Sequence, residues 1–438
     1  MLDIKYIREN AVKIKEAAKN KNIKLDLDKL LKLDDKRKEL QTEIDQLRAK
    51  RNELAKAAKG EKPTKEQIKQ GKTIKTEIQD LEKKFKKSDD EYAAMMVIVP
   101  TITAKDVPIG KDETENVEIF RSQDPPKFDF PIKSHIELGR DLDIIDFDRG
   151  VKISGYRGYF LKNEGVSLAM AIMMHALNKL IAKGFKPMIP PTLVREFVLF
   201  GSGYFSGQEF NPAKDEIYKI ENIEKEADGK VNKENRFLVG TAEPSLLAYY
   251  ANEVLEEKDL PIKICGYSQC YRSEIGSYGK DTAGLYRVHE FMKIEQVCLA
   301  KADIKEADKL HQEMLAISKE LHEDLELPYR VLQICTGDMS AGKYKMFDLE
   351  AWIPSQKRWG ETGSASNFVD WQARRLKVRY KDKQGKVQPV FMLNNTALAT
   401  PRTIISILEN HQQKDGSVLV PKVLRKWMPG EVKVIKRK

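Results

Sequence analysis

The sequence predicts an α+β protein in which a long antiparallel helical hairpin precedes a domain built on an antiparallel β-sheet. Apolar residues recur every seven positions near the N-terminus, on both sides of a turn, which is typical of an antiparallel coiled coil. Further along, two strand-like runs within residues 267–295 flank a long polar loop, which indicates a β-hairpin. The chain has 438 residues, enough for two or more domains with a sizeable core.

The helical hairpin is predicted over about residues 28–97, with its turn in the segment KGEKPTK. In the first helix, one seam position holds Leu33, Leu40, Leu47 and Leu54, and the other holds Leu30 and Ile44 but is interrupted by Arg37 and Arg51. In the second helix, the seam positions hold Ile74 and Leu81, and Ile78, Phe85 and Tyr92. Each helix of about thirty residues would reach roughly 45 Å.

The hairpin is rich in basic residues, and the whole chain carries a formal net charge of +10. An excess of lysine and arginine favours a polyanionic partner, most commonly a nucleic acid. The basic residues of the tip and both arms are Lys50, Arg51, Lys56, Lys59, Lys62, Lys65, Lys69, Lys72 and Lys75. Such a cluster suits contact with phosphates without reading of bases. The alternative is a solvated coiled coil that mediates dimerisation, and composition leaves both open.

Composition also indicates a cytoplasmic protein. We find no apolar run long enough to span a membrane, and the N-terminus MLDIKYIREN lacks the apolar core of a signal peptide. Four cysteines are too few for a disulfide framework in so long a chain. Cys265 and Cys270 lack the spacing of zinc ligands, so we expect buried thiols and no zinc.

The chain divides into an N-terminal domain (1–105), a proline-punctuated linker (106–135) and a main domain (136–438). Within the main domain, residues 165–185 predict a largely buried helix that ends at Gly184. Residues 186–194 predict a strand that contains Pro190 and Pro191. Residues 222–236 predict a polar surface excursion with a turn at Asp228–Gly229.

The stretch YRSEIGSYGKDTAGLYRVHEFMKIE contains the strongest functional pattern. Alternate residues of a strand share a face, so we expect Arg272 and Glu274 to point the same way. An arginine fork beside a carboxylate suits a phosphate plus an adenine amino group. In isolation, the tripeptide RSE is more often a surface ion pair. The polar loop between the strands contains Gly276, Gly279, Lys280, Asp281 and Gly284, and the second strand carries Arg287, His289, Phe291 and Glu295.

Three further segments carry residues suited to the same chemistry. In GTAEPSL, Thr241 and Glu243 lie two apart on a predicted strand and could meet an ammonium group or a small hydroxyl, although a helix cap is the alternative. Glu350 and Glu361 lie on strand-like segments and, with phosphate oxygens, would suit Mg²⁺. Arg402 stands at the start of an apolar-periodic helix, where a phosphate is favoured.

Together these motifs resemble the bacterial type of the seryl-tRNA synthetase family, which belongs to the class II aminoacyl-tRNA synthetases, and the resemblance extends over essentially the entire chain. It implies an antiparallel-sheet class II catalytic domain, preceded by a coiled-coil arm that grips tRNA. The helix and strand at 165–194 would form a homodimer interface. The implied reaction is ATP-dependent activation of L-serine to seryl-adenylate, followed by transfer to the 3′ end of tRNA(Ser). The selenocysteine acceptor tRNA(Sec) is an expected second substrate, and ATP and Mg²⁺ are the expected cofactors.

The resemblance also assigns site residues. Those implied to bind ATP are Arg272, Ser273, Glu274, Val288, Phe291, Glu361, Thr362, Gly363, Ser364 and Arg402, and those implied to bind serine are Thr241, Ala242, Glu243, Glu295 and Thr396. Arg272, Arg402 and Glu361 are the implied catalytic residues, and Glu361 and Ser364 the implied metal ligands. His289 is interpreted as structural or adjacent to ATP rather than as a base.

The chain departs from the usual family pattern at a few of these positions. The family usually reads EISSCSN where this chain has ETGSASN, so side-chain contacts by Thr362 and Gly363 do not carry over. Thr396 stands where many members have serine, and Pro401 where glycine is common, but the hydroxyl and the arginine are retained.

Three other functions fit the sequence less well. A synthetase-like ligase that loads a carrier protein would lack the long basic arm. A non-catalytic RNA-binding paralogue would be expected to lose a phosphate arginine or an amino-acid carboxylate, yet Arg272, Arg402, Glu243 and Glu295 are all present. A structural coiled-coil protein would leave the main domain unexplained.

Overall fold

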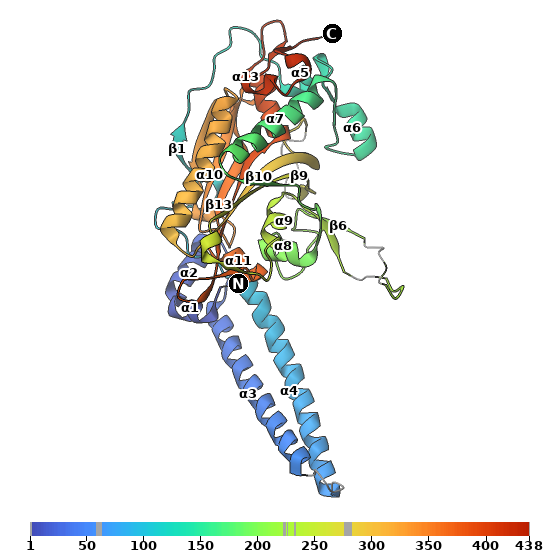
Figure 1. Cartoon of the computed structure of the whole chain (residues 1–438), viewed down its shortest axis with the longest axis vertical. Helices are drawn as coiled ribbons and strands as arrows, with labels where there is room; N and C mark the ends of the chain where they lie inside the picture. The colour runs from blue at the N-terminus through green and yellow to red at the C-terminus, as the bar shows by residue number, and fades with distance from the viewer. Residues whose placement is uncertain are drawn as a thin grey trace. The chain divides into compact units, whose positions relative to one another are not determined.

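The computed structural model describes residues 2–57, 64–221, 225, 227–231, 234–275 and 283–437. Its contacts divide the chain into two units, Met1–Pro100 and Thr101–Lys438 (Figure 1). The segment 106–135, predicted as a linker, belongs to the second unit and contains strand β1 (Val117–Arg121). All five residues of β1 are exposed, so its apolar residues Val117, Ile119 and Phe120 belong to no buried face.

The first unit is helical and confirms the predicted coiled-coil hairpin. It consists of α1 (Ile4–Glu9), α2 (Ala11–Asn20), α3 (Leu27–Ala57) and α4 (Lys65–Val97), with α3 and α4 antiparallel (Figure 1). The buried seam residues are Leu30, Leu33, Leu40, Ile44, Ile74 and Ile78. Thr64 begins α4 with a capping box to Gln67. The turn residues 58–63, which include Lys59 and Lys62, lie outside the described residues.

Arg37 interrupts the apolar seam, and the opposite helix accommodates its charge. Its guanidinium carbon lies 4.1 Å from the ring centroid of Tyr92 and 5.8 Å from that of Phe85. Its Nε also donates a 2.6 Å hydrogen bond to Asp89. Because aromatic faces and a carboxylate both stabilise a cation, this seam position tolerates arginine.

The second unit is built on an eight-stranded sheet in the order β1–β11–β12–β13–β16–β10–β9–β4. The strands after β1 are β4 (Lys186–Met188), β9 (Ile262–Tyr271), β10 (Glu290–Ala300), β11 (Tyr329–Gln333), β12 (Lys345–Ile353), β13 (Arg358–Asn367) and β16 (Phe391–Ala399). Neighbours in the sheet are antiparallel, except that β4 runs parallel to β9. The predicted hairpin within residues 267–295 is the β9–β10 pair, which confirms that prediction.

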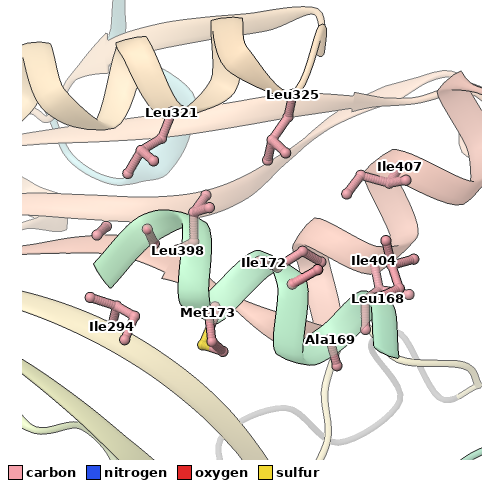
Figure 2. Close-up of a cluster of buried hydrophobic side chains, with 14 of the residues drawn as sticks. Leu168, Ala169, Ile172, Met173, Ile294, Leu321, Leu325, Leu398, Ile404 and Ile407 are labelled. Carbon is pink, nitrogen blue, oxygen red and sulfur yellow. The ribbon is translucent and has the colours of Figure 1, made fainter. Parts of the chain in front are cut away.

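Helices α7 (Glu164–Ala182), α10 (Ile304–Asp324) and α12 (Thr400–Asn410) pack against this sheet. Figure 2 shows Leu168, Ala169, Ile172 and Met173 of α7 beside side chains of β10, β16, α10 and α12 in the main hydrophobic core. By length and composition, α7 is long and apolar enough to cross a membrane, so the prediction that no such run exists was wrong. In this fold one side of α7 is part of the core.

Among the smaller elements, the one strand predicted at residues 186–194 differs in the structure. Residues 186–194 form two short strands rather than one, because β4 joins the large sheet and β5 (Leu193–Arg195) pairs with β7 in another. The remaining elements are α5 (His135–Asp141), β2 (Ile145–Asp146), α6 (Phe147–Ser154), β3 (Phe160–Leu161), α8 (Glu196–Ser202), β6 (Tyr218–Ile220), β7 (Arg236–Leu238), α9 (Glu243–Ala248), β8 (Val254–Glu256), α11 (Trp371–Leu376), β14 (Arg379–Lys381), β15 (Val387–Pro389), β17 (Val418–Leu419), α13 (Lys422–Arg425) and β18 (Val434–Ile435).

Candidate active site

A pocket on the large sheet gathers side chains from the segments that follow β9 and precede β10, from β10, β13 and β16, and from the start of α12. The predicted site residues that line it are Arg272, Glu274, Val288, Phe291, Glu361, Thr362, Gly363, Thr396 and Arg402. Five other lining residues, Tyr286, Arg287, Lys293, Ala399 and Pro401, were not predicted. The pocket therefore brings together segments that lie up to 130 residues apart in sequence.

Arg272 and Glu274 lie in the pocket wall, but not on a strand as predicted. Strand β9 ends at Tyr271, and Glu274 has a φ of 53°, so strand alternation does not set its direction. Contacts hold the segment instead: the Arg272 amide donates to the His289 carbonyl at 2.9 Å, and Arg287 Nη1 lies 3.2 Å from Glu274 Oε2. His289 Nδ1 lies 2.9 Å from the Arg272 carbonyl oxygen and donates to it, which fits a structural role for His289.

Arg402 and Glu361 form an ion pair in the pocket. Arg402 Nη1 lies 3.0 Å from Glu361 Oε2, and Arg402 Nε donates to the Tyr286 carbonyl at 3.2 Å. Removal from water disfavours the charged carboxylate. The charge and hydrogen bond of Arg402, together with the charges of Arg272 and Lys343, outweigh this effect and lower the pKa of Glu361. The Tyr286 ring lies 4.5 Å from the Arg402 guanidinium carbon, so it supports the cation from one face.

The residues predicted to bind serine meet beside this pocket. Glu295 Oε2 accepts hydrogen bonds from the hydroxyls of Thr241 at 3.0 Å and Thr396 at 3.4 Å, and Lys293 Nζ lies 2.8 Å away. Thr241, Glu243 and Glu295 are all buried. Burial of two carboxylates in one place is costly unless cations and donors compensate, which makes this an attractive position for a ligand ammonium group.

Glu243 is held by three neutral donors rather than by strand geometry. Its oxygens accept from Tyr204 Oη at 2.8 Å, Gln372 Nε2 at 2.7 Å and Asn394 Nδ2 at 2.8 Å. Burial, followed by repulsion from Glu295, raises the pKa of Glu243. The predicted strand for GTAEPSL was wrong: β7 ends at Leu238, Ala242 is the residue before α9, and Glu243 begins that helix.

Several predicted residues stand outside the pocket lining. Ser273, Ser364 and Ala242 are among these, as are Thr241, Glu243 and Glu295, although Thr241 and Glu295 connect to it through Thr396. The hydroxyl of Thr362 pairs with buried His322 Nε2 at 2.7 Å, so it is directed into the protein. Gly363 leaves room for its neighbour, because a Cβ there would lie 3.2 Å from the Thr396 carbonyl. The loop residues Gly276, Gly279, Lys280 and Asp281 lie outside the described residues.

The predicted metal ligands have an additional acidic neighbour. Ser364 lies opposite Asp348 on β12 and donates a hydrogen bond to it, and Asp348 Oδ1 has no hydrogen-bond partner. Burial and then the charge of Glu361 raise the pKa of Asp348. Glu350 instead pairs with Arg330 at 2.6 Å and does not line the pocket. Within the described ranges, no cluster of three or more His, Cys, Asp or Glu side chains could hold a metal.

Sequence reasoning missed residues for two different reasons. Lys293 could have been found, because it lies between Phe291 and Glu295 at the alternate spacing of one strand face. Tyr286 and Asp348 carried no local signal, because their roles depend on Arg402 and Ser364, which are distant in sequence.

The chain matches two domain families and several known proteins. Residues 1–103 match the seryl-tRNA synthetase N-terminal domain, and residues 218–411 match the tRNA synthetase class II core domain (G, H, P, S and T). The chain is 44% identical to the serine–tRNA ligase of Borrelia garinii subsp. bavariensis over 435 residues, 98% of each protein.

Two solved structures have the same architecture. The seryl-tRNA synthetase from Pyrococcus horikoshii complexed with ATP matches with a TM-score of 0.85 and 38% identity over 100% of both chains. The cytoplasmic serine–tRNA ligase from Naegleria fowleri in complex with AMP matches with a TM-score of 0.83 and 30% identity, over 100% of this chain and 99% of that one. With relatives this similar over its whole length, and with a cleft that gathers the motif residues, the chain belongs to the seryl-tRNA synthetase family of class II aminoacyl-tRNA synthetases.

Proposed function

We propose that the cleft activates L-serine with ATP and transfers the seryl group to the 3′ end of tRNA(Ser). The observation that carries this proposal is that a positively charged region of the cleft lies next to a negatively charged region. One contains Arg272 and Arg402, which suit phosphates, and the other contains Glu243 and Glu295, which suit an ammonium group. Thr396 lines the pocket and bonds to Glu295, so it connects the two regions.

ATP would occupy the region lined by Phe291, Glu274 and the two arginines. Phe291 faces the pocket beside Arg272, whose guanidinium carbon lies 5.5 Å from the ring centroid, and a base stacked there would gain about 1–3 kcal/mol. Arg402 would hold the γ-phosphate and Arg272 the α-phosphate, near which the substrate carboxylate attacks. Attack forms an O–P bond as the bond to pyrophosphate breaks, and it requires alignment and positive charge more than a base.

Serine would bind with its ammonium group toward Glu295 and Glu243 and its hydroxyl toward Thr241 and Thr396. A site built to bond a hydroxyl rejects alanine strongly, because its polar groups would be left unpaired. Threonine would be rejected by crowding against one extra methyl.

The oxygen donors on the paired strands β12 and β13 fit Mg²⁺. Glu361, Ser364 and the unpartnered oxygen of Asp348 are hard ligands, and this cation commonly adds phosphate oxygens and waters to a few protein ligands. When bound, Mg²⁺ would neutralise phosphate charge. Arg402 would retain its hold on Glu361 and orient the carboxylate for that role.

The proposal is tested by serine-dependent exchange of pyrophosphate into ATP. Arg272→Ala and Arg402→Ala should each lower exchange by at least roughly 100-fold, because each removes charge stabilisation at a phosphate. Arg374→Ala is a matched control, since Arg374 pairs with Asp370 at 2.7 Å away from the pocket and should leave exchange unchanged. Exchange with threonine, alanine or glycine in place of serine, or normal exchange by both pocket variants, would contradict the proposal.

We further infer that the N-terminal domain (1–105) binds tRNA through the hairpin and that the main domain (136–438) catalyses both steps. The described lysines Lys65, Lys69, Lys72 and Lys75 are exposed on α4, where phosphates could reach them. The acceptor tRNA(Sec) is a further proposed substrate, which charging of a tRNA(Sec) transcript would test.

We also propose that the protein is a homodimer and is cytoplasmic. Elements α6, β3 and α7 and their connections expose several large apolar side chains, namely Val151, Ile153, Tyr156, Phe160, Val166 and Met170. Exposed apolar groups in such number suit a second copy of the chain, and light scattering would give the mass. The four free cysteines are buried, which suits a reducing cytoplasm.

A further inference from the structure

Three residues at alternate positions of β10 form a row along the cleft. Phe291 and Lys293 line the pocket, and Glu295 follows beside it. Alternate residues of a strand share a face and are about 7 Å apart. Under the proposed function, Phe291 marks the adenine end and Glu295 the ammonium end. Lys293 therefore lies between them, where the serine carboxylate and the α-phosphate must meet.

Lys293 is fixed in this position by polar contacts. Its side chain is only 6% exposed, and Nζ lies 2.8 Å from Glu295 Oε2 and 3.4 Å from Thr396 Oγ1. An ammonium group has three donors, so Nζ retains capacity for another acceptor after these two contacts. Because these contacts and burial already order this long side chain, the entropy cost of binding a ligand is reduced.

Charge balance indicates which ligand group this would be. Glu243 and Glu295 are two buried carboxylates, whereas Lys293 is the one buried lysine beside them among the described residues. The ammonium group of serine would neutralise the surplus negative charge. Serine also brings a carboxylate, and an unpaired charge in such a place is strongly unfavourable.

Two other cations of the pocket pair with carboxylates that themselves line it, whereas Glu295, the partner of Lys293, lies outside the lining. Among the described lining residues, Arg402 pairs with Glu361 and Arg287 pairs with Glu274. Arg272 and Lys293 remain as the cations best placed for a substrate carboxylate, with Arg272 also required at the α-phosphate.

We propose that Lys293 binds the carboxylate of the incoming serine and holds it in line with the α-phosphorus of ATP. This inference rests on the proposed function. Lys293 donates hydrogen bonds and transfers no proton. Its contact with Glu295 would place the carboxylate and ammonium groups of one amino acid beside alternate residues of the same strand.

The test compares two ligands that differ at the carboxylate alone. L-serinamide keeps the ammonium group and hydroxyl of L-serine but replaces the carboxylate with a neutral amide. Binding of each to the full chain is measured by titration calorimetry with α,β-methylene-ATP present, at mildly acidic pH where both amines are protonated. Lys293→Met should weaken serine binding by roughly 10- to 100-fold while serinamide affinity changes little, because the variant removes a charge-assisted hydrogen bond to the carboxylate alone.

Matched variants separate this role from a structural one. Lys263→Met is the control, because Lys263 pairs with Glu313 at 2.6 Å on the adjacent strand β9, outside the pocket, and it should leave both affinities unchanged. Lys293→Gln keeps a donor for Glu295 without the charge and should show the same selective loss as Lys293→Met. Lys293→Arg should restore part of the preference for serine.

Two outcomes would overturn the proposal. Equal loss of serine and serinamide in Lys293→Gln would make Lys293 a partner of Glu295 only, and unchanged serine binding would remove it from the site. Failure of the unmodified chain to bind serine would instead contradict the proposed function, so the two failures are distinguishable.

Discussion

Glu243 illustrates a conflict between stability and function in a single residue. Its pKa is raised, first by burial and then by Glu295, so the folded state holds its proton more readily than the unfolded chain does. For such an acid, the folded state is penalised at pH values above the raised pKa. The penalty disappears as pH falls below the unfolded value. The carboxylate is retained, we infer, because serine brings an ammonium group.

Glu243→Gln should therefore stabilise the protein at neutral pH and impair serine activation. A glutamine oxygen can still accept from Gln372 and Asn394, while its amide donates to Tyr204, so geometry is retained. Urea unfolding at a series of pH values should show a gain that shrinks toward acid, and pyrophosphate exchange should show serine kcat/KM reduced by roughly 10-fold or more. A loss of stability at neutral pH would contradict this account, and Glu313→Gln, at a partly exposed ion pair, is the control.

Departures from the family pattern are also explained at this scale. Thr362 replaces an apolar residue, and its hydroxyl bonds to buried His322. The absent side chain of Gly363 leaves space beside Thr396, whose Cγ2 would lie 3.8 Å from a Cβ at position 363. Neither departure removes a charged group from the pocket.

At the scale of elements, both ends of α12 anchor residues 284–286, which precede β10. Arg402 in the first turn bonds to the Tyr286 carbonyl at 3.2 Å. Glu409 in the last turn accepts from His135 Nδ1 at 2.8 Å, and His135 Nε2 accepts from the Leu285 amide at 3.2 Å. The His135 ring therefore donates from Nδ1 and accepts at Nε2, which links Glu409 to Leu285. Gly284 permits the approach, with a φ of 81° and a Cβ position 2.2 Å from His135 Nε2.

Glu409→Gln should loosen this attachment. Burial disfavours the charge of Glu409, but hydrogen bonds from His135 and from the Ser355 amide outweigh it and lower its pKa. A glutamine would place an amide N–H against one of these donors, which should cost about 1.5–3 kcal/mol in the free energy of unfolding. Because the pKa is lowered, the stability is present above the ordinary value of 4.5 and is lost as pH falls through the folded pKa.

Urea unfolding of the unmodified protein and of Glu409→Gln, at pH values from neutral downward, checks this prediction. The difference between their free energies of unfolding should disappear only at acidic pH. The KM for ATP should rise more than the KM for serine, since Tyr286 lines the pocket. Equal changes in both KM values, or none in either, would show that the contact stabilises the fold without positioning the nucleotide site.

At the scale of the whole molecule, the charge of the helical hairpin should act on tRNA charging and leave activation untouched. Lys65, Lys69 and Lys72 are exposed and follow the spacing of one helix face on α4. Changing all three to Glu should lower charging of tRNA(Ser) at moderate salt and flatten its dependence on salt concentration, because fewer counterions are released. Pyrophosphate exchange should be unchanged.

The control makes the same charge change elsewhere. Lys381, Lys383 and Lys386 are exposed residues of the second unit, at β14 and the turn after it. Their replacement by Glu should affect charging less than the hairpin variant does. If both triple variants lose charging equally, net charge rather than the hairpin is responsible.

The sequence by itself determined the features that depend on short-range pattern. Heptad spacing predicts the hairpin helices, and the strand–loop–strand order predicts the β9–β10 pair. Both patterns arise from residues that are close together in the sequence. The motifs likewise named most of the pocket lining.

Only the tertiary structure decided which of these side chains meet. It placed Arg272 and Glu274 after the end of strand β9, placed Glu243 on a helix, and made part of the predicted linker the edge strand β1. It joined His135 to Glu409, which are 274 residues apart. Such contacts depend on packing between distant segments, and no local periodicity encodes them.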